Sequence, residues 1–316
     1  MLDSRLLARL NRKKALLDSL HPLPSAAVRR LNAQLTIEWT YHSNAIEGST
    51  LTLRETQLII ETGLTIGGKS LREHFEVINH KQAIDYVEAL ATGAEPIDAF
   101  QVRQIHRLVL TGIDNANAGQ YRNLPVRIAG ARHQPPESWE ISLLMAQWTE
   151  WLHGDALALH AVERAALAHH RLAAIHPFID GNGRTARLVM NLLLLRDGYT
   201  PTIILRENRA QYYRVLAEAD AGREAPIANF VGRAVERSLT LYLDACTPQR
   251  GPSASADQWI PLRLAAGGTP YSQEYLSLLA RTGRLEAVKR GKVWYTTRQA
   301  VDAYRQSVES SREASA

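Results

Sequence analysis

The stretch HPFIDGNGRTAR, which runs from His176 to Arg187, decides the fold of this chain. Its proline and its two glycines interrupt any regular helix, so the first part of the stretch is expected to form a loop. A helix is predicted to begin near Asn182, because an apolar run with helical spacing follows, comprising Leu188, Val189, Leu192, Leu193 and Leu195. The stretch therefore predicts a glycine-rich loop that leads directly into a helix.

Such a loop can bind an anion, because the start of a helix presents free backbone N–H groups and the positive end of the helix dipole. Asp180 could hold Mg²⁺ against phosphate oxygens, and Arg184 and Arg187 could form paired hydrogen bonds with phosphates. His176 is the group in the stretch that is suited to take up a proton near neutral pH. The stretch is not a P-loop, because no Lys-Ser/Thr pair follows the glycines.

The stretch resembles the signature of the Fic family, HxFx(D/E)GNGRxxR. It matches at every fixed position, namely His176, Phe178, Asp180, Gly181, Asn182, Gly183, Arg184 and Arg187. The similarity extends over residues 30–245 and includes AGQYRNLPVRIAG before the motif and NRAQYYRVL after it. The resemblance implies a helical core that transfers part of a nucleotide, most often AMP from ATP, to a hydroxyl group of a protein.

The resemblance also implies a role for each residue of the motif, with ATP as substrate and Mg²⁺ as cofactor. Asp180 positions Mg²⁺ between the α- and β-phosphates. The backbone N–H groups of Gly181 to Gly183 and the amide of the asparagine between them hold the α-phosphate. Arg184 and Arg187 bind the β- and γ-phosphates. His176 removes the proton from a Ser, Thr or Tyr hydroxyl of the target protein, which attacks the α-phosphorus.

A second motif, SNAIEG, lies upstream in LNAQLTIEWTYHSNAIEG, residues 31–48. Its apolar spacing predicts a helix that ends at Gly48. Ser43 and Glu47 are four residues apart and therefore lie on one face of that helix. Taken alone, Glu47 could be an ordinary solvated residue before a glycine. The motif is similar to the Fic inhibitory pattern (S/T)xxxE(G/N), which implies that Glu47 pairs with Arg187 and takes the place of the γ-phosphate.

Two further sets of residues take their roles from the resemblance. Tyr212 and Tyr213 have the spacing of ordinary core aromatics, but the family closes its adenine pocket at this point, with Asn208 as a further candidate. Pro125 to Ile128 are β-prone and precede Gly130, so by themselves they predict a short strand or an irregular connection. In the family this segment is a β-hairpin flap that lines the target hydroxyl, here with Val126, Arg127 and Ile128.

Helical periodicity dominates the rest of the chain. Helices are predicted at residues 4–20, 25–47, 53–62, 70–93, 97–111, 137–153, 157–175, 184–197, 207–219 and 224–245. The expected fold is mainly α: a Fic helical core with a short β-hairpin flap, followed by a small winged-helix or helix-turn-helix domain. The expected domains are an N-terminal helical region with the inhibitory helix at 1–95, the catalytic core at 96–245, a linker at 246–257 and the small domain at 258–316.

The last part of the chain is basic. Residues 258–316 contain nine Lys or Arg and five Asp or Glu, which gives a net charge of +4 out of the +5 of the whole chain. A helix, a β-prone hairpin centred on residues 289–292 and a second helix are predicted there, with Tyr275, Arg281 and Arg284 on the recognition side. This pattern favours DNA binding, although a docking or dimerisation unit with a solvated charged face remains open.

Composition excludes several classes of protein. The chain has 316 residues, of which 45% are hydrophobic and 22% charged, so it is globular rather than disordered. The single cysteine, Cys246, excludes an internal disulfide framework and a cysteine-based zinc site. No uncharged apolar run reaches the length of a membrane span, and the first residues do not resemble a secretory signal. We therefore expect a cytoplasmic protein without membrane contact.

Several alternatives remain open from the sequence. The same site could remove AMP from a modified protein, with Glu47 orienting a water, or it could transfer another nucleotide or phosphoryl group. The chain could also be a DNA-binding regulator in which the Fic core is a sensor. Self-modification at a surface hydroxyl and pairing of two copies through the N-terminal helices are further expectations.

Overall fold

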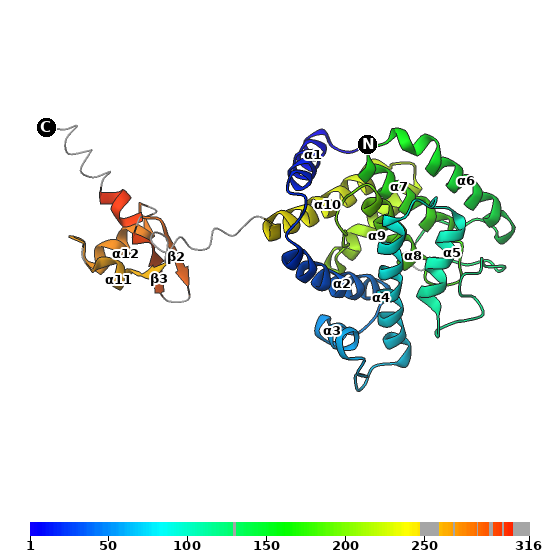
Figure 1. Ribbon diagram of the computed structural model, residues 1–316, viewed down its shortest axis with the longest axis horizontal. Coiled ribbons are helices and arrows are strands. Elements are labelled where there is room, and N and C mark those ends of the chain that lie inside the picture. Colours follow the sequence, from blue (N-terminus) through cyan, green and yellow to red (C-terminus); the bar gives the residue numbers. More distant parts are fainter. Residues whose placement is uncertain are drawn as a thin grey trace. The chain divides into compact units, whose positions relative to one another are not determined.

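The computed structural model describes residues 1–128, 131–246, 259–267, 269–282, 284–290, 293–298 and 300–305. The chain forms two compact units, Met1–Cys246 and Thr247–Ala316 (Figure 1). The structure is mainly helical, as predicted, and within the described residues strands occur only in the second unit. The predicted linker at 246–257 lies outside the described residues, except for Cys246.

The helices of the first unit follow the predicted periodicity closely. They are α1 (Ser4–Ser19), α2 (Ser25–Glu47), α3 (Leu53–Thr62), α4 (Leu71–Thr92), α5 (Ala99–Leu110), α6 (Ile141–His153), α7 (Ala161–Ile175), α8 (Asn182–Arg196), α9 (Arg209–Asp220) and α10 (Ala225–Cys246). Three short 3₁₀ segments precede α6, α7 and α9, namely η1 (Ser138–Glu140), η2 (Asp155–Ala158) and η3 (Arg206–Asn208). The predicted helices at 137–153 and 157–175 therefore each begin with a 3₁₀ segment.

Helix α8 lies at the centre of this unit and packs against α7, α4, α5 and α2 (Figure 1). Nearly all of its side chains are buried, including Arg184 and Arg187. A helix that is buried all round must satisfy its charged residues inside the protein. The position of α8 therefore forces partners for these two arginines to come from neighbouring helices.

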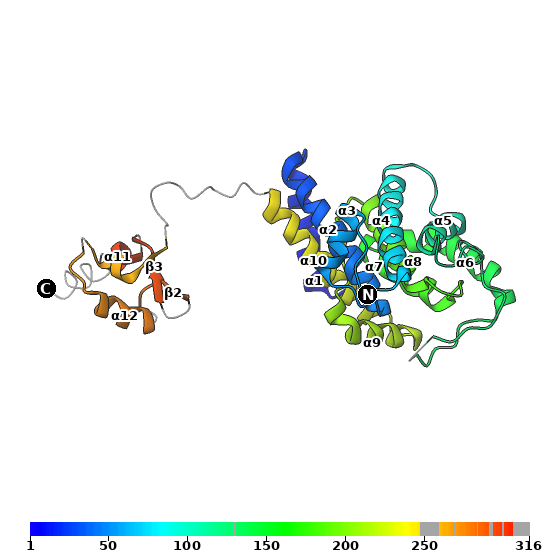
Figure 2. The same cartoon turned by 90° about the horizontal axis from the view of Figure 1, so that it is seen from below.

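Helix α2 brings its last turn against the start of α8. It packs against α4, α8 and α10, while α1 lies along α10 in both views (Figures 1 and 2). Gly48 ends α2 in a left-handed conformation with φ 109°, and its N–H donates to the carbonyl of Ala45 at 3.3 Å. The predicted helix end at Gly48 is thus present.

The second unit has its own hydrophobic core. Its elements are β1 (Ile260–Pro261), α11 (Leu262–Ala266), α12 (Gln273–Arg281), β2 (Ala287–Arg290) and β3 (Val293–Thr296), and residues 300–305 are helical. The strands form an antiparallel sheet in the order β1-β3-β2. The core comprises Leu262, Ala265, Leu276, Leu279, Ala280, Leu285, Val301 and Tyr304. Of the predicted hairpin centre, Gly291 and Lys292 lie outside the described residues.

Of the two predictions for Pro125 to Ile128, a short strand or an irregular connection, the structure has the irregular connection. The described residues of the segment 121–137 form no strand, and Ala129 and Gly130 lie outside the described residues. A strand needs a partner with free N–H groups, and the returning segment contains Pro135 and Pro136, which have none. In its described residues the predicted β-hairpin flap is therefore an irregular connection. None of the helices in the described part of the chain is long and apolar enough to cross a membrane.

Candidate active site

The loop between α7 and α8 is held in shape by its own side chains. Oδ1 of Asn182 accepts a hydrogen bond from the backbone N–H of Phe178 at 2.9 Å, and Nδ2 donates to the carbonyl of Phe178 at 2.8 Å. Phe178 is fully buried, and its ring stacks on His106 with centroids 3.6 Å apart. The sequence predicted that the amide of Asn182 faces a phosphate. In the structure this amide braces the loop.

His176 ends α7 with a backbone φ of 50°, a left-handed conformation that few non-glycine residues adopt. Its Nδ1 lies 3.2 Å from the carbonyl oxygen of Ala173. A carbonyl oxygen only accepts, so Nδ1 carries the proton and Nε2 keeps the lone pair. Burial lowers the pKa of His176 below its usual 6.5, and Arg122 acts in the same direction. The imidazole is therefore neutral near pH 7, as a general base must be.

Arg122 fixes the loop from outside the motif, and no role was predicted for it. Its backbone N–H donates to the carbonyl of Pro177 and its Nε to the carbonyl of His176, both at 2.9 Å. Its Nη2 donates to the carbonyl of Pro136 at 2.6 Å. Arg122 thus joins the motif to the connection that replaces the predicted flap strand. Arg122 lies in the segment AGQYRNLPVRIAG. The similarity of this segment to the Fic family was therefore the sequence signal that could have pointed to Arg122.

His106 is the second residue that the sequence did not point to. Its Nε2 lies 2.9 Å from the carbonyl oxygen of Asp180, and its Nδ1 accepts from the backbone N–H of Gly119 at 3.0 Å. Burial lowers the pKa of His106 to about 4, so it stays neutral. It sits on the buried face of α5 outside any motif. Only its position beside the loop in three dimensions gives it a role.

Asp180, the predicted cation ligand, belongs to a closed ring of four charged side chains. Its Oδ1 accepts from the N–H of Gly181 at 2.6 Å and from Arg184 at 3.3 Å, and its Oδ2 accepts from Arg72 of α4. Glu76, also on α4, accepts from Arg72 and Arg184 at 3.2 Å each. Burial alone would raise the pKa of Asp180, but Arg184 and the other donors lower it overall. Asp180 is therefore ionised near neutral pH.

Arg187 is bound to the last turn of α2. Its Nη2 donates to Oε1 of Glu47 at 2.7 Å and to the carbonyl of Ser43 at 2.8 Å, and its Nε donates to Oγ of Ser43 at 3.1 Å. The Arg187 side chain is 3% exposed and that of Glu47 is 35% exposed. Burial alone would lower the pKa of Arg187, but the carboxylate of Glu47 raises it overall. The structure thus brings together Ser43, Glu47 and Arg187.

Gly183 shows why a carboxylate fits here. A Cβ added at this position would collide with Oε1 of Glu47 and would lie 3.1 Å from Nη1 of Arg187. The carboxylate of Glu47 therefore lies against the first turn of α8, at the positive end of the helix dipole. A phosphate bound at the same helix end would compete with Glu47 for this position.

The two tyrosines of α9 have different surroundings. Tyr212 is buried, and its hydroxyl lies 2.7 Å from Nε2 of His169. Burial raises the pKa of Tyr212 to about 12, although a hydrogen bond with Arg187 opposes this shift. Tyr213 is only half-buried, and its ring is covered by the guanidinium of Arg209 at 4.9 Å. Of the two tyrosines, Tyr213 is therefore the one that the adenine base of a nucleotide could reach.

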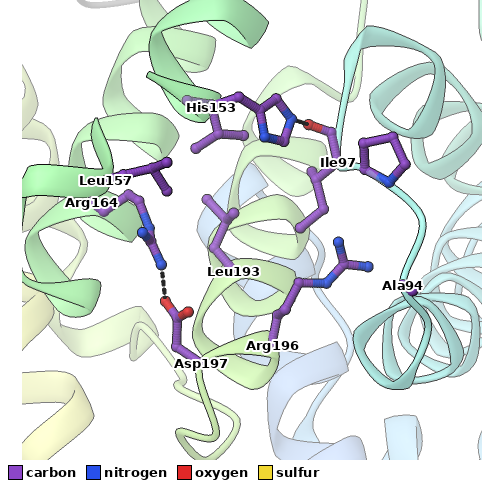
Figure 3. Close-up of a pocket in the computed structure, with 10 residues that line it drawn as sticks. Ala94, Ile97, His153, Leu157, Arg164, Leu193, Arg196 and Asp197 are labelled. Carbon is purple, nitrogen blue, oxygen red and sulfur yellow. Dashed lines mark hydrogen bonds and ion pairs between the residues drawn. The ribbon is translucent and has the colours of Figure 1, made fainter. Parts of the chain in front are cut away.

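Asn208, the third residue predicted for the adenine pocket, lines a separate cavity of about 190 Å³. The other polar residues of this cavity are Gln211, Arg233 and Arg237. A larger cavity of about 350 Å³ lies at the C-terminal end of α8 (Figure 3). It is enclosed by α6, by α7 and by the loop that precedes α5. It contains none of the predicted site residues, so we place the active site by its charges rather than by cavity size.

Comparison with known proteins agrees with this geometry. Residues 96–194 match the model of the Fic/DOC family. The chain is 40% identical over 254 residues to "Protein adenylyltransferase Fic" of Drosophila willistoni, which covers 79% of this chain and 50% of that protein. The chain thus spans about half the length of the curated relatives that it matches.

Two solved structures share its fold. Fic-1 from C. elegans superposes with a TM-score of 0.70 at 34% identity, over 77% of this chain and 73% of that one. A Fic domain containing signaling protein from Bacteroides thetaiotaomicron gives a TM-score of 0.71 at 30% identity, over 75% of this chain and 96% of that one. These similarities cover most of the chain and include the motif at the start of α8. The chain therefore belongs to the Fic/DOC family.

Proposed function

We propose that this chain is a protein adenylyltransferase, which moves AMP from ATP to the hydroxyl of a Ser, Thr or Tyr side chain. The protein target includes the chain itself. Glu47 holds the enzyme inactive by pairing with Arg187. The observation that carries this proposal is the position of the Glu47 carboxylate. It lies on a motif arginine at the N-terminus of α8, where a triphosphate would place its own negative charge.

The carboxylate of Asp180 would suit a hard divalent cation as a ligand, in exchange for its present ion pairs with Arg72 and Arg184. The carboxylate is ionised and its side chain is 43% exposed, at the edge of the anion-binding loop. Among the described residues, no three His, Cys, Asp or Glu side chains gather closely enough to bind a metal by themselves. A cation here would therefore be shared between Asp180 and phosphate oxygens, as Mg²⁺ commonly is. When bound, Mg²⁺ would neutralise charge on the phosphates.

The chemistry follows from the tautomer of His176. Its Nε2 takes the proton of the target hydroxyl, and the oxygen attacks the α-phosphorus in line with the bond to the β-phosphate. That bond breaks, pyrophosphate leaves, and a phosphodiester to AMP remains on the target. Arg184 and Arg187 select which phosphorus faces the hydroxyl, because they hold the two phosphates beyond it. The N–H groups at the start of α8 stabilise the charge that develops on the α-phosphate.

Inhibition by Glu47 follows from the same geometry. Arg187 cannot bind a γ-phosphate while its Nη2 donates to Glu47 and to the Ser43 carbonyl. A carboxylate against the first turn of α8 also repels a triphosphate. ATP that enters beside Glu47 is therefore misaligned, with its α-phosphorus turned away from His176.

An adduct assay tests the proposal. Wild type, Glu47→Gly and the double variant Glu47→Gly, His176→Ala are incubated with ATP and Mg²⁺, and intact-mass spectrometry measures any covalent increment. We expect an AMP-sized increment in Glu47→Gly alone. Glu38→Gln is a matched control, because Glu38 is a carboxylate of the same helix that pairs with Gln34. Incorporation of label from γ-labelled rather than α-labelled ATP would contradict adenylyl transfer.

We further propose that the second unit is a winged helix that binds double-stranded DNA. The specific observation is its topology. Along the chain, β1 is followed by α11, α12 and the hairpin β2-β3, and the three strands form a sheet in the order β1-β3-β2. This is the arrangement of a winged helix. Arg281 and Arg284 are exposed near the end of α12, and Lys289 is exposed on the hairpin. These positive charges lie where a recognition helix and a wing would meet phosphates.

A gel shift with the full-length chain tests DNA binding. We expect retardation of a duplex at low salt, and loss of retardation in Arg281→Glu, Lys289→Glu. Each phosphate contact that is lost should reduce the slope of log K against log salt by about 0.9. Arg54→Glu, an exposed charge reversal in the first unit, serves as the control. A duplex that is not retarded at low salt would contradict DNA binding.

A further inference from the structure

Glu47 occupies an electrostatically unfavourable place in its own helix. It is the last residue of α2, and the carbonyl end of a helix carries a partial negative charge that repels a carboxylate. The last turn of α2 contains no basic residue that could compensate. The position of Glu47 against Arg187 must therefore be stabilised by groups from outside α2.

Two arginines from other helices supply this stabilisation. Arg187 of α8 donates to the carbonyl of Ser43 at 2.8 Å, as described above. Arg209, the first residue of α9, donates from Nε to the carbonyl of Ile46 at 2.8 Å. The two carbonyls between Ser43 and Ile46 accept from backbone N–H groups. The carbonyl of Asn44 accepts from Ser49 at 3.1 Å, and that of Ala45 accepts from Gly48 at 3.3 Å. Arg209 therefore holds the peptide unit that directly precedes Glu47.

The guanidinium of Arg209 is itself fixed from the other side. It covers the ring of Tyr213 at 4.9 Å, an arrangement that stabilises a cation over an aromatic face. The segment before α9 also contacts α2, because the backbone N–H of Arg206 donates to Nδ1 of His42 at 3.0 Å. Helix α9, which carries Tyr213, and the segment η3 before it are thus each connected to the last two turns of α2.

We propose that Arg209 is a positioning residue for autoinhibition: it locks the end of α2 so that Glu47 stays on Arg187. This inference rests on the proposed function, because it concerns the regulation of the same site. Without Arg209 the carbonyl of Ile46 loses its donor and its compensating charge. The last turn of α2 then frays, and Glu47 leaves Arg187 more often.

The test compares Arg209→Ala in two backgrounds, with Glu47 present and with Glu47→Gly. The quantity measured is the inhibition factor, the ratio of the adduct rate of the Glu47→Gly enzyme to that of the Glu47 enzyme. We expect Arg209→Ala to lower this factor by about 5- to 10-fold, within the range of measured couplings between sites. It should leave the rate in the Glu47→Gly background unchanged. Arg209→Lys keeps the charge and should lower the factor less.

Hydrogen exchange gives a readout that does not depend on activity. Arg209→Ala should speed amide exchange in residues 44–48 and leave exchange in α8 unchanged. Arg214→Ala is the matched control, because Arg214 is an exposed arginine of the same helix whose carboxylate partner, Glu218, lies 4.0 Å away. Unchanged exchange in residues 44–48 would overturn the inference, whatever the activity.

The outcomes separate the two proposals. If Glu47→Gly does not raise the adduct rate, the proposed autoinhibition fails, and the exchange data alone decide what Arg209 does to α2. If Glu47→Gly raises the rate but Arg209→Ala leaves the inhibition factor unchanged, only the role of Arg209 fails. A fall in rate in the Glu47→Gly background would make Arg209 a nucleotide-binding residue and would likewise overturn the inference.

Discussion

The two ends of α8 carry similar charged side chains but differ in what those side chains can do. At the N-terminal end, Arg187 pairs with a carboxylate in the last turn of α2. At the C-terminal end, about 14 Å further along the helix, Arg196 donates to the carbonyls of Glu95 and Leu90 at 2.5 and 2.6 Å. The first arginine has a partner that a phosphate can replace. The second is bound to main-chain groups that nothing replaces.

The helix dipole explains part of this difference. The N-terminal end of α8 attracts the carboxylate of Glu47, and the C-terminal end favours the cations Arg164 and Arg196. The larger cavity lies at the C-terminal end (Figure 3). It holds the ion pair between Arg164 and Asp197 at 2.6 Å, and Arg196 in the same cavity is bound to main-chain carbonyls. We therefore expect function to depend on the N-terminal end and stability on the C-terminal end.

The largest expected effect is loss of the general base. In the Glu47→Gly background, His176→Ala should lower the adduct rate by ~10²- to 10⁴-fold, as general bases typically contribute. The matched change at the other end is His153→Ala, which removes a histidine that lines the large cavity. A timed adduct assay on both variants measures the contrast. Equal losses in the two would remove the functional distinction between the ends of α8.

Removing the carboxylate at the N-terminal end should have the opposite sign. Glu47→Gly is expected to raise the adduct rate by about 10- to 100-fold, comparable to a coupling of 1–3 kcal/mol. At the C-terminal end, Asp197→Asn also removes the acidic partner of an arginine. We expect no activation from that change in the same assay. Activation by Asp197→Asn would show that α8 transmits changes along its length.

The pH dependence of the active variant sharpens the assignment of the base. Because burial lowers the pKa of His176 below its usual 6.5, the imidazole becomes protonated only at a lower pH than an exposed histidine. The rate of Glu47→Gly should therefore be constant near pH 7 and fall about tenfold per pH unit only below that lowered pKa. A pH profile of the initial rate checks this. A decline that already starts above pH 7 would exclude His176 as the titrating base.

The smallest expected effect concerns stability at the C-terminal end. The ion pair between Arg164 and Asp197 is partly exposed, with side chains 16% and 24% exposed, so its contribution is modest. Asp197→Asn should lower the free energy of unfolding by about 1 kcal/mol. Urea denaturation of the wild type and of this variant measures the change. A decrease of several kcal/mol in the free energy of unfolding would contradict this modest contribution and would show that the fold depends on the pair.

Local sequence predicted the parts of the site that depend on backbone conformation. Glycines and a proline marked the loop, and the apolar run placed the start of α8 near Asn182, within two residues of where the structure has it. The four-residue spacing of Ser43 and Glu47 put both on one face of α2, and both contact Arg187. For Pro125 to Ile128 the irregular connection expected from sequence alone is present, whereas the short strand is not, because β-propensity does not supply a partner strand.

Other features could not be predicted because they depend on which helices meet. Arg122, His106 and Arg209 lie far apart in sequence from the groups that they bind, and each bonds a main-chain carbonyl. Any residue supplies such a carbonyl, so the pairing leaves no pattern of residue types to detect. The side chain of Asn182 shows the same limit, because its amide binds the loop backbone.

The sequence by itself determined which chemical groups this protein has and which short segments present them: a histidine, an aspartate and two arginines around a helix start, and a glutamate at a helix end. Only the tertiary structure decided that the glutamate lies on the second arginine. Because α8 is buried all round, its arginines must find acceptors on neighbouring helices, and the packing of α2 and α4 decides which acceptors those are.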